Sequence, residues 1–144
     1  MGKKRIIRKQ GSSVDRGLQS RSLSRLPKKK LDKGILHIQA TYNNTKVLFS
    51  DMQGNAIMWS TSGGLGFTGA KKSTPFAAAK VGEVVGEKAA AIGVKEAEVI
   101  IRGVGPGRES AMRSFASKGI AIVKITDDTP VPHNGPQQRK PRRV

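Results

Sequence analysis

Residues 35–61 read ILHIQATYNNTKVLFSDMQGNAIMWST, and this stretch decides the fold of the first half of the chain. Residues 35–42 alternate between apolar and polar side chains, which is the period of a strand with one buried face. The side chains expected on the buried face are Leu36, Ile38, Ala40 and Tyr42. The stretch therefore begins with a half-buried β-strand.

Two turn signals divide the remainder of this stretch. Asn43-Asn44 follows the first strand, and Gln53-Gly54-Asn55 follows residues 46–51. Residues 46–51 and 56–61 are consequently predicted as the second and third strands. Connections this short join antiparallel neighbours. We therefore expect the three strands to form an antiparallel meander.

The second half of the chain alternates between helix and strand signals. Thr74-Pro75 has the residue types of a helix N-cap and first turn, and Gly93 suits the end of that helix. Further strands are predicted at residues 97–102 and 120–126, with a second helix at about 108–118 between them. Such connections favour parallel pairing. The predicted fold class is α/β, a single domain with a mixed five-stranded sheet and two helices.

Small residues recur every four positions along the first of these helices. They are Ala78, Gly82, Gly86 and Ala90. A ridge this low lets another element approach closely. A sheet or a neighbouring helix is a more natural occupant of that ridge than RNA.

The charge of the chain points to a polyanionic partner. Lys and Arg number 27 against 10 Asp and Glu, which gives a formal net charge of +17. Residues 1–33 hold 12 of the cations, opposed only by Asp15 and Asp32. This extension is expected to be disordered in isolation and to fold on its partner. After this extension, the chain is predicted to consist of an α/β domain at residues 34–128 and a basic tail at residues 129–144.

The tail has the composition of an extended, positively charged arm. Thr129-Pro130-Val131-Pro132 enforces a non-helical path, and His133-Asn134 follows. The cations near its end are Arg139, Lys140, Arg142 and Arg143. A segment of this kind orders against an anionic surface, and RNA phosphates are the expected surface.

A glycine-rich loop at residues 62–73 precedes the first helix. Gly64-x-Gly66-x-x-Gly69 matches the dinucleotide-binding motif by letter, but a meander precedes it and the helix begins several residues later. Glycines let phosphates approach backbone N–H groups, and Lys71-Lys72 lie just before a helix N-terminus. We interpret this loop as an RNA-backbone contact, with Phe67 as the one aromatic residue suited to stack on a base.

Residues 103–107 form a second glycine-rich turn, and Arg108 follows it. The turn lacks the Gly-Lys-Ser/Thr ending of a nucleotide-binding P-loop. Two interpretations stay open: a structural strand-to-helix turn, or a phosphate contact through Gly105, Gly107 and Arg108.

Enzymatic and metal chemistry find little support in the sequence. The chain has no cysteine and two histidines, and its first strand has no acid with which a metal-dependent nuclease would hold its ions. We expect no cofactor and no catalytic role. No apolar run is long enough to span a membrane, and no secretory signal is expected. An organelle transit segment is the minor alternative to a cytoplasmic protein.

Six motifs together resemble one family, the bacterial-type small-ribosomal-subunit protein eleven. The motifs are Gly34-x-x-His37-Ile38-x-Ala40-Thr41-x-Asn43-Asn44-Thr45, Asp51-x-x-Gly54-Asn55, Trp59-Ser60, Gly66-Phe67-x-Gly69-x-Lys71-Lys72-Ser73-Thr74-Pro75-Phe76-Ala77-Ala78, Gly105-Pro106-Gly107-Arg108-Glu109 and Thr129-Pro130-x-Pro132-His133-Asn134-Gly135. The resemblance covers roughly residues 34–144.

This resemblance implies an RNase-H-like topology without nuclease activity and a structural role in translation. It implies a place on the platform of the small subunit, where the protein bridges rRNA helices. The tail would lie near the mRNA exit and the Shine–Dalgarno cleft. Implied partners are the platform proteins numbered seven, eighteen and twenty-one, and initiation factor three is a further candidate. A free-standing RNA-binding protein or RNA chaperone is the competing interpretation.

The residues predicted to bind RNA follow partly from the local sequence patterns and partly from the resemblance to the family. They are Asn43, Asn44, Gly64, Gly66, Phe67, Lys71, Lys72, Ser73, Gly105, Gly107, Arg108, His133, Asn134, Arg139, Lys140, Arg142 and Arg143.

Overall fold

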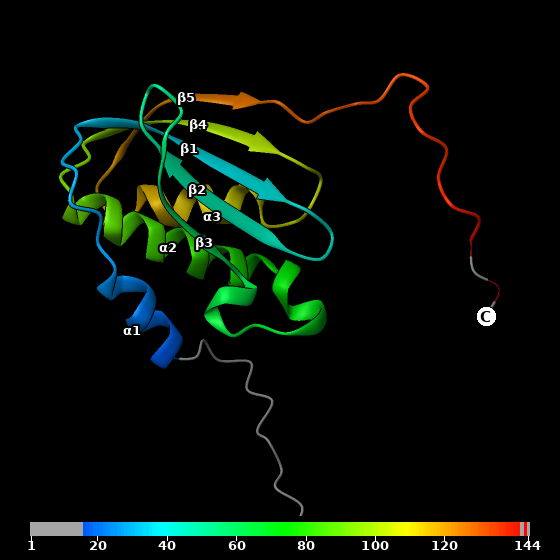
Figure 1. Cartoon of the computed structure of the whole chain (residues 1–144), viewed down its shortest axis with the longest axis horizontal. Helices are drawn as coiled ribbons and strands as arrows, with labels where there is room; N and C mark the ends of the chain where they lie inside the picture. Colours follow the sequence, from blue (N-terminus) through cyan, green and yellow to red (C-terminus); the bar gives the residue numbers. More distant parts are fainter. Residues whose placement is uncertain (1–15, 142, 144) are drawn as a thin grey trace, which may run out of the picture.

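A computed structural model describes residues 16–141 and Arg143. Within these residues the strands form one sheet in the order β3-β2-β1-β4-β5 (Figure 1). The strands are β1 (Lys33–Ala40), β2 (Thr45–Ser50), β3 (Ala56–Thr61), β4 (Glu96–Arg102) and β5 (Ala121–Asp127). The α-helices of the described residues are α1 (Arg16–Ser24), α2 (Pro75–Ala91) and α3 (Arg108–Ala116).

The pairing of the strands confirms the predicted mixed sheet. β1 pairs antiparallel with β2, and β2 with β3, whereas β1 pairs parallel with β4, and β4 with β5. Ile38 lies opposite Val47 of β2 and opposite Ile101 of β4. All three side chains are buried. Helices α2 and α3 cover the face that they form, so the core lies between this face and the two helices (Figure 1).

Helix α3 occupies the ridge of small residues on α2. A Cβ atom built on Gly82 would lie 2.3 Å from the carbonyl oxygen of Ala111, and one on Gly86 would lie 3.2 Å from that of Phe115. Phe115 in turn stacks against Phe49 of β2, with ring centroids 6.1 Å apart. The expectation that protein, rather than RNA, packs on this ridge is confirmed.

One residue of the first strand was assigned to the wrong environment. Tyr42 was expected on the buried face, but its side chain is 73% exposed. β1 ends at Ala40, and the Thr41 N–H donates to the carbonyl of Asn44 at 2.9 Å to begin the turn. The alternation of side chains therefore stops before it reaches Tyr42.

Two segments have more regular structure than the sequence suggested. Residues 62–73 contain two short 3₁₀ helices, η1 (Gly63–Leu65) and η2 (Gly69–Ser73). In the N-terminal extension, α1 lies beside α2 and β3 (Figure 1), and Leu23 packs partly against the core. The sequence indicated two helices and did not predict α1. Residues 1–15 lie outside the described part, so the disorder expected of residues 1–33 stays a prediction there.

Candidate nucleic-acid interface

The segment between β3 and α2 is held in place by buried side chains. Leu65 is fully buried, and Phe67 is 5% exposed. The Phe67 ring meets the ring of Phe76 edge to face, with centroids 6.1 Å apart. The structure therefore contradicts the prediction that Phe67 stacks on a base, because its side chain is buried in the protein's own core.

The backbone N–H groups of residues 64–67 are already hydrogen-bonded within the chain. The N–H of Gly64 donates to the Thr61 hydroxyl at 3.0 Å, and the N–H of Gly66 donates to the carbonyl of Gly63 at 3.2 Å. Leu65 and Phe67 both donate to the carbonyl of Ser62. Gly64 and Gly66 therefore shape the segment instead of offering free donors to a phosphate, which corrects the role predicted for them.

The lysines at the end of this segment do present charge. Lys71 is exposed, Lys72 is half-buried, and neither forms an ion pair within the described residues. The hydroxyl of Ser73 donates to the carbonyl of Ala70 at 3.1 Å. Thr74 caps α2 by accepting from the N–H of Ala77 at 3.3 Å. The two lysines thus lie just before a capped helix N-terminus, where an anion is favoured.

The second glycine-rich turn packs against protein backbone. A Cβ atom on Gly105 would lie 2.2 Å from the carbonyl oxygen of Thr41, and one on Gly107 would lie 2.5 Å from the Thr45 hydroxyl. The N–H of Gly105 donates to the carbonyl of Ala40 at 3.0 Å. Both glycines are buried. Of the two interpretations left open, this structure supports the structural turn for Gly105 and Gly107.

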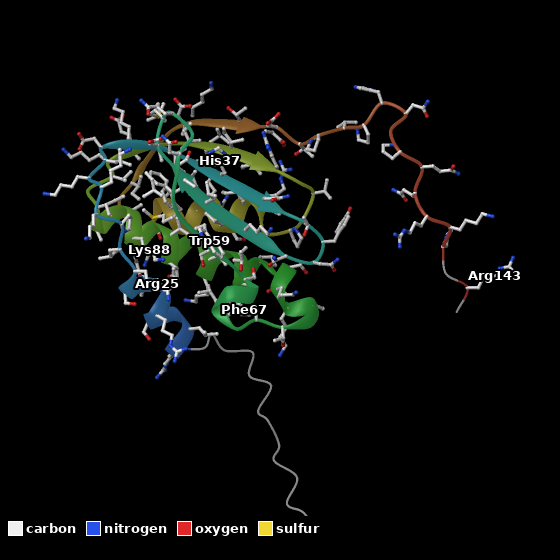
Figure 2. The ribbon with its side chains drawn as sticks, viewed as in Figure 1. Arg25, His37, Trp59, Phe67, Lys88 and Arg143 are labelled. Atoms are coloured by element: carbon white, nitrogen blue, oxygen red, sulfur yellow. The ribbon has the colours of Figure 1, made fainter. Side chains whose placement is uncertain are left out.

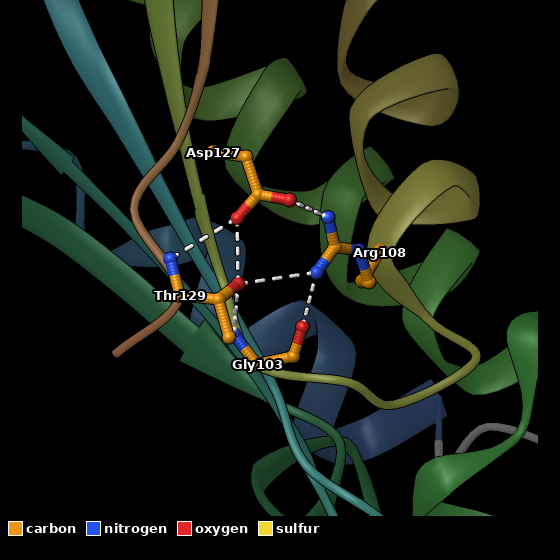
Figure 3. A network of polar contacts seen from close by, with 4 residues as sticks. All are labelled: Gly103, Arg108, Asp127 and Thr129. Carbon is orange, nitrogen blue, oxygen red and sulfur yellow. Dashed lines mark hydrogen bonds and ion pairs between the residues drawn. The ribbon is translucent and has the colours of Figure 1, made fainter. Parts of the chain in front are cut away.

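Arg108 belongs to a network within the chain. Its guanidinium donates to the carbonyl of Gly103 and to the Thr129 hydroxyl, and it forms an ion pair with Asp127 (Figure 3). The Thr129 N–H and hydroxyl both donate to the Asp127 carboxylate, at 3.0 and 2.6 Å. The bonds from Thr129 and then Arg108 lower the pKa of Asp127 to about 2. The structure therefore shows an internal role for Arg108, and its predicted phosphate contact stays a prediction.

A neighbouring ion pair fastens the start of the tail as well. Arg102 at the end of β4 is paired with Asp128, whose N–H donates to the carbonyl of Ile101 at 2.9 Å. Thr129 is half-buried, whereas residues 130–141 are all exposed, with Val131 at 72%. Figure 1 shows the tail running away from the domain after β5.

The basic tail residues that the structure describes are open to solvent. His133, Asn134, Arg139, Lys140 and Arg143 are all exposed. None of these cations has an acidic partner in the described part of the chain. Arg142 lies outside the described residues. The remaining two predicted positions, Asn43 and Asn44, form the β1–β2 turn, where the Asn44 side-chain oxygen is buried without a hydrogen-bond partner among the described residues.

Known proteins are similar to this chain over most of its length. The family described as "Ribosomal protein S11" matches residues 34–143. The chain belongs to this family. Proteins named "Small ribosomal subunit protein uS11" are similar to it: one from Polynucleobacter asymbioticus is 54% identical over 81% of this chain and 87% of its own length. Another, from Ruthia magnifica, is 55% identical over 81% and 92%.

A relative from another bacterium gives the same result. The protein of that name from Treponema pallidum is 51% identical over 83% of this chain and 95% of its own length. The S11 family is a structural, non-enzymatic component of ribosomes, which confirms the expectation drawn from the motifs. No helix in the described residues has the length and apolar character to cross a membrane. Residues 16–141 and 143 hold no cluster of His, Asp and Glu suited to a metal ion.

The face of the sheet opposite α2 and α3 carries residues that the sequence argument overlooked. A cavity of about 570 Å³ opens there, lined in part by His37, Leu48, Trp59, Ile100 and Arg102. Trp59 is 66% exposed. Burial lowers the pKa of His37, and the charge of Arg102 lowers it further. Strand alternation could have revealed this face, because it places Trp59 on the side opposite the buried Met58.

Proposed function

We propose that this chain is a structural constituent of the small ribosomal subunit that binds rRNA and bridges rRNA helices on the platform. The observation that carries the proposal is the tail, which has exposed cations and no acidic partner for them among the described residues. An arm of this kind has nothing in its own domain to order it. Phosphates along an RNA backbone supply the missing charge.

Bridging requires two separate places of contact. Lys71 and Lys72 lie before α2, whereas the tail leaves the domain after β5 and runs away from it (Figure 1). The ion pairs of Arg108 with Asp127 and of Arg102 with Asp128 hold the start of the tail against the domain. Two basic elements on a rigid domain can therefore engage two RNA segments at once.

The finer assignments rest on the resemblance to the family. We propose that the tail lies near the mRNA exit and the Shine–Dalgarno cleft. We also propose that platform proteins seven, eighteen and twenty-one are neighbours, with initiation factor three contacting the same region. The open sheet face, with its exposed Trp59, supports the presence of a macromolecular partner there. Bacterial relatives favour cytoplasmic ribosomes over organelle ribosomes as the location.

Ultraviolet crosslinking in cells, with sequencing of the attached RNA and mapping of the crosslinked peptides, tests this proposal. We expect crosslinks to a few platform helices of small-subunit rRNA, through residues 69–73 and 133–143. The chain should also sediment with small subunits. Crosslinks scattered over many mRNAs without enrichment of rRNA would instead support a free-standing RNA-binding protein.

A further inference from the structure

A lysine on α2 has a buried side chain and no acidic partner for its charge among the described residues. Lys88 is 6% exposed, and its ammonium forms no hydrogen bond or ion pair there. Its Nζ still has accessible surface, so the charge opens into a cavity instead of being sealed in the core. Burial lowers the pKa of this ammonium, and the positive charge of Arg25 lowers it further.

Two other lysines near α2 are neutralised by glutamate carboxylates. Lys80 lies 2.9 Å from the Glu83 carboxylate, and Lys118 of the α3 end lies 3.0 Å from that of Glu87. Lys88 lies in the apolar stripe of α2, seven residues after Val81 and four after Val84. No glutamate of the helix pairs with Lys88, so an anion that neutralises it would come from outside the helix.

Lys88 lines a cavity of about 420 Å³ between α1, β3 and α2. Arg21 and Arg25 contribute two further cations, and no carboxylate of residues 16–141 belongs to the lining. Neither arginine has an ion pair among the residues that the structure describes. Figure 2 shows Arg25, after α1, in the neighbourhood of Lys88. Three cations around one cavity repel one another unless an anion enters it.

We propose that this cavity binds a backbone phosphate of RNA through Arg21, Arg25 and Lys88. Arginine offers a planar fork that matches two phosphate oxygens, and lysine offers a point charge from the floor of the cavity. The inference deepens the proposed rRNA-binding function and depends on it. It also gives α1 a role, because docking of this helix completes the site.

The edge of the cavity favours RNA over an acidic peptide. Trp59 lies on the lining and remains 66% exposed. An exposed indole beside a phosphate site suits a nucleotide, whose base can stack on the ring while its phosphate meets the cations. Gly64, in the segment that leads to Lys71 and Lys72, also lines the cavity. The site therefore adjoins the segment that presents these two lysines.

Replacement of Lys88 by methionine separates this role from a structural one. We expect full-length Lys88→Met to bind small-subunit rRNA about tenfold more weakly, which is the loss of one charge-assisted phosphate contact. The slope of log affinity against log salt should fall by roughly one unit. Arg25→Gln should act in the same direction. Lys118→Met is the matched control, since it removes one charge that Glu87 already neutralises.

A probe anion tests the site without RNA. At constant ionic strength, inorganic phosphate in place of chloride should raise the melting temperature of the wild type more than that of Lys88→Met. In chloride alone, Lys88→Met should be at least as stable as the wild type, because it removes a partly desolvated charge that Arg25 repels. Equal stabilisation of both proteins by phosphate would show that the anion binds elsewhere, and it would overturn the site.

The binding experiment distinguishes failure of this site from failure of the proposed function. If Lys88→Met and Arg25→Gln keep wild-type affinity and slope while Lys71→Ala with Lys72→Ala weakens binding, the cavity is not a phosphate site and the rRNA-binding function stands. That result would also be the outcome for a cavity that takes an acidic peptide. If the wild type prefers small-subunit rRNA no more than a scrambled RNA, both proposals fall.

Discussion

Arg108, the first residue of α3, forms an ion pair with Asp127, the last residue of β5. The same guanidinium donates to the carbonyl of Gly103, and Thr129 closes the network (Figure 3). The pair joins a helix to the strand from which the tail departs. Arg108, a residue predicted to meet phosphate, therefore fastens the start of the tail, which carries further residues predicted to bind phosphate.

Replacement of Arg108 should reduce stability more than an ordinary surface substitution does. We expect Arg108→Ala to lower the free energy of unfolding by about 2 kcal/mol, because hydrogen bonds from a charged donor are lost. Arg113→Ala, on the same helix, is the control: within the described residues it pairs only with Glu109, on the surface, which is worth about 0.5 kcal/mol or less. Urea unfolding measures both. Equal effects would mean that the Arg108 network contributes nothing special.

The pH dependence of stability should show the contribution of the ionised Asp127 carboxylate. Its pKa is about 2 in the folded chain against an ordinary value of 3.8, so the folded state favours the ionised carboxylate. Its contribution is complete above about pH 5 and is lost as the pH falls through 3.8 towards 2. The difference in unfolding free energy between wild type and Asp127→Asn should therefore be constant above about pH 5 and shrink below it. A difference that persists unchanged to pH 2 would contradict the assignment.

Gly105 should not tolerate a side chain, for a reason that is purely steric. Its φ is not positive, but a Cβ atom would lie 2.2 Å from the carbonyl oxygen of Thr41. We expect Gly105→Ala to cost about 3 kcal/mol of stability. Gly54→Ala is the comparison, since Gly54 has a φ of +91° and open space around it. That substitution should cost about 1 kcal/mol through backbone strain alone. Thermal unfolding distinguishes the two.

Two aromatic residues should separate core packing from RNA contact. Phe67→Leu should lower stability by about 1 kcal/mol and leave rRNA affinity unchanged, because Phe67 is buried against Phe76. Trp59→Leu should change stability by less than about 0.5 kcal/mol. It should weaken rRNA binding by about 1–3 kcal/mol if a base stacks on the exposed indole. The opposite pattern of affinities would restore Phe67 as the stacking residue.

Local patterns were sufficient to predict the sheet. The alternation around Ile38 and the short turns after β1 and β2 report on neighbours that are close in sequence, so the meander could be foreseen. The same reasoning overextended the first strand to Tyr42, because alternation does not reveal that the Gly105 N–H meets the carbonyl of Ala40 and the chain turns there. Strand ends depend on contacts that are distant in sequence.

The candidate site was harder to predict for the same reason. Gly105 and Gly107 indicated that another group packs closely against the backbone at these positions. They did not indicate whether that group is RNA or the β1–β2 turn. Arg108 and Asp127 lie 19 residues apart and meet only because β4 and β5 pair in parallel. Lys88 did carry a local signal that was missed, a charge within the apolar stripe of α2.

Lys71 and Lys72 should act on RNA binding without affecting the fold. Neither has an ion pair among the described residues, so Lys71→Ala with Lys72→Ala should change the free energy of unfolding by less than about 0.5 kcal/mol. RNA binding releases fewer counterions when phosphate contacts are lost. The slope of log affinity against log salt should therefore fall by roughly 1 to 2 units. Lys33→Ala is the control, because Glu96 neutralises Lys33 at 2.7 Å. Filter-binding titrations of small-subunit rRNA across a salt series measure the slopes. An unchanged slope in the double variant would remove these lysines from the interface and leave the tail as the main source of phosphate contacts.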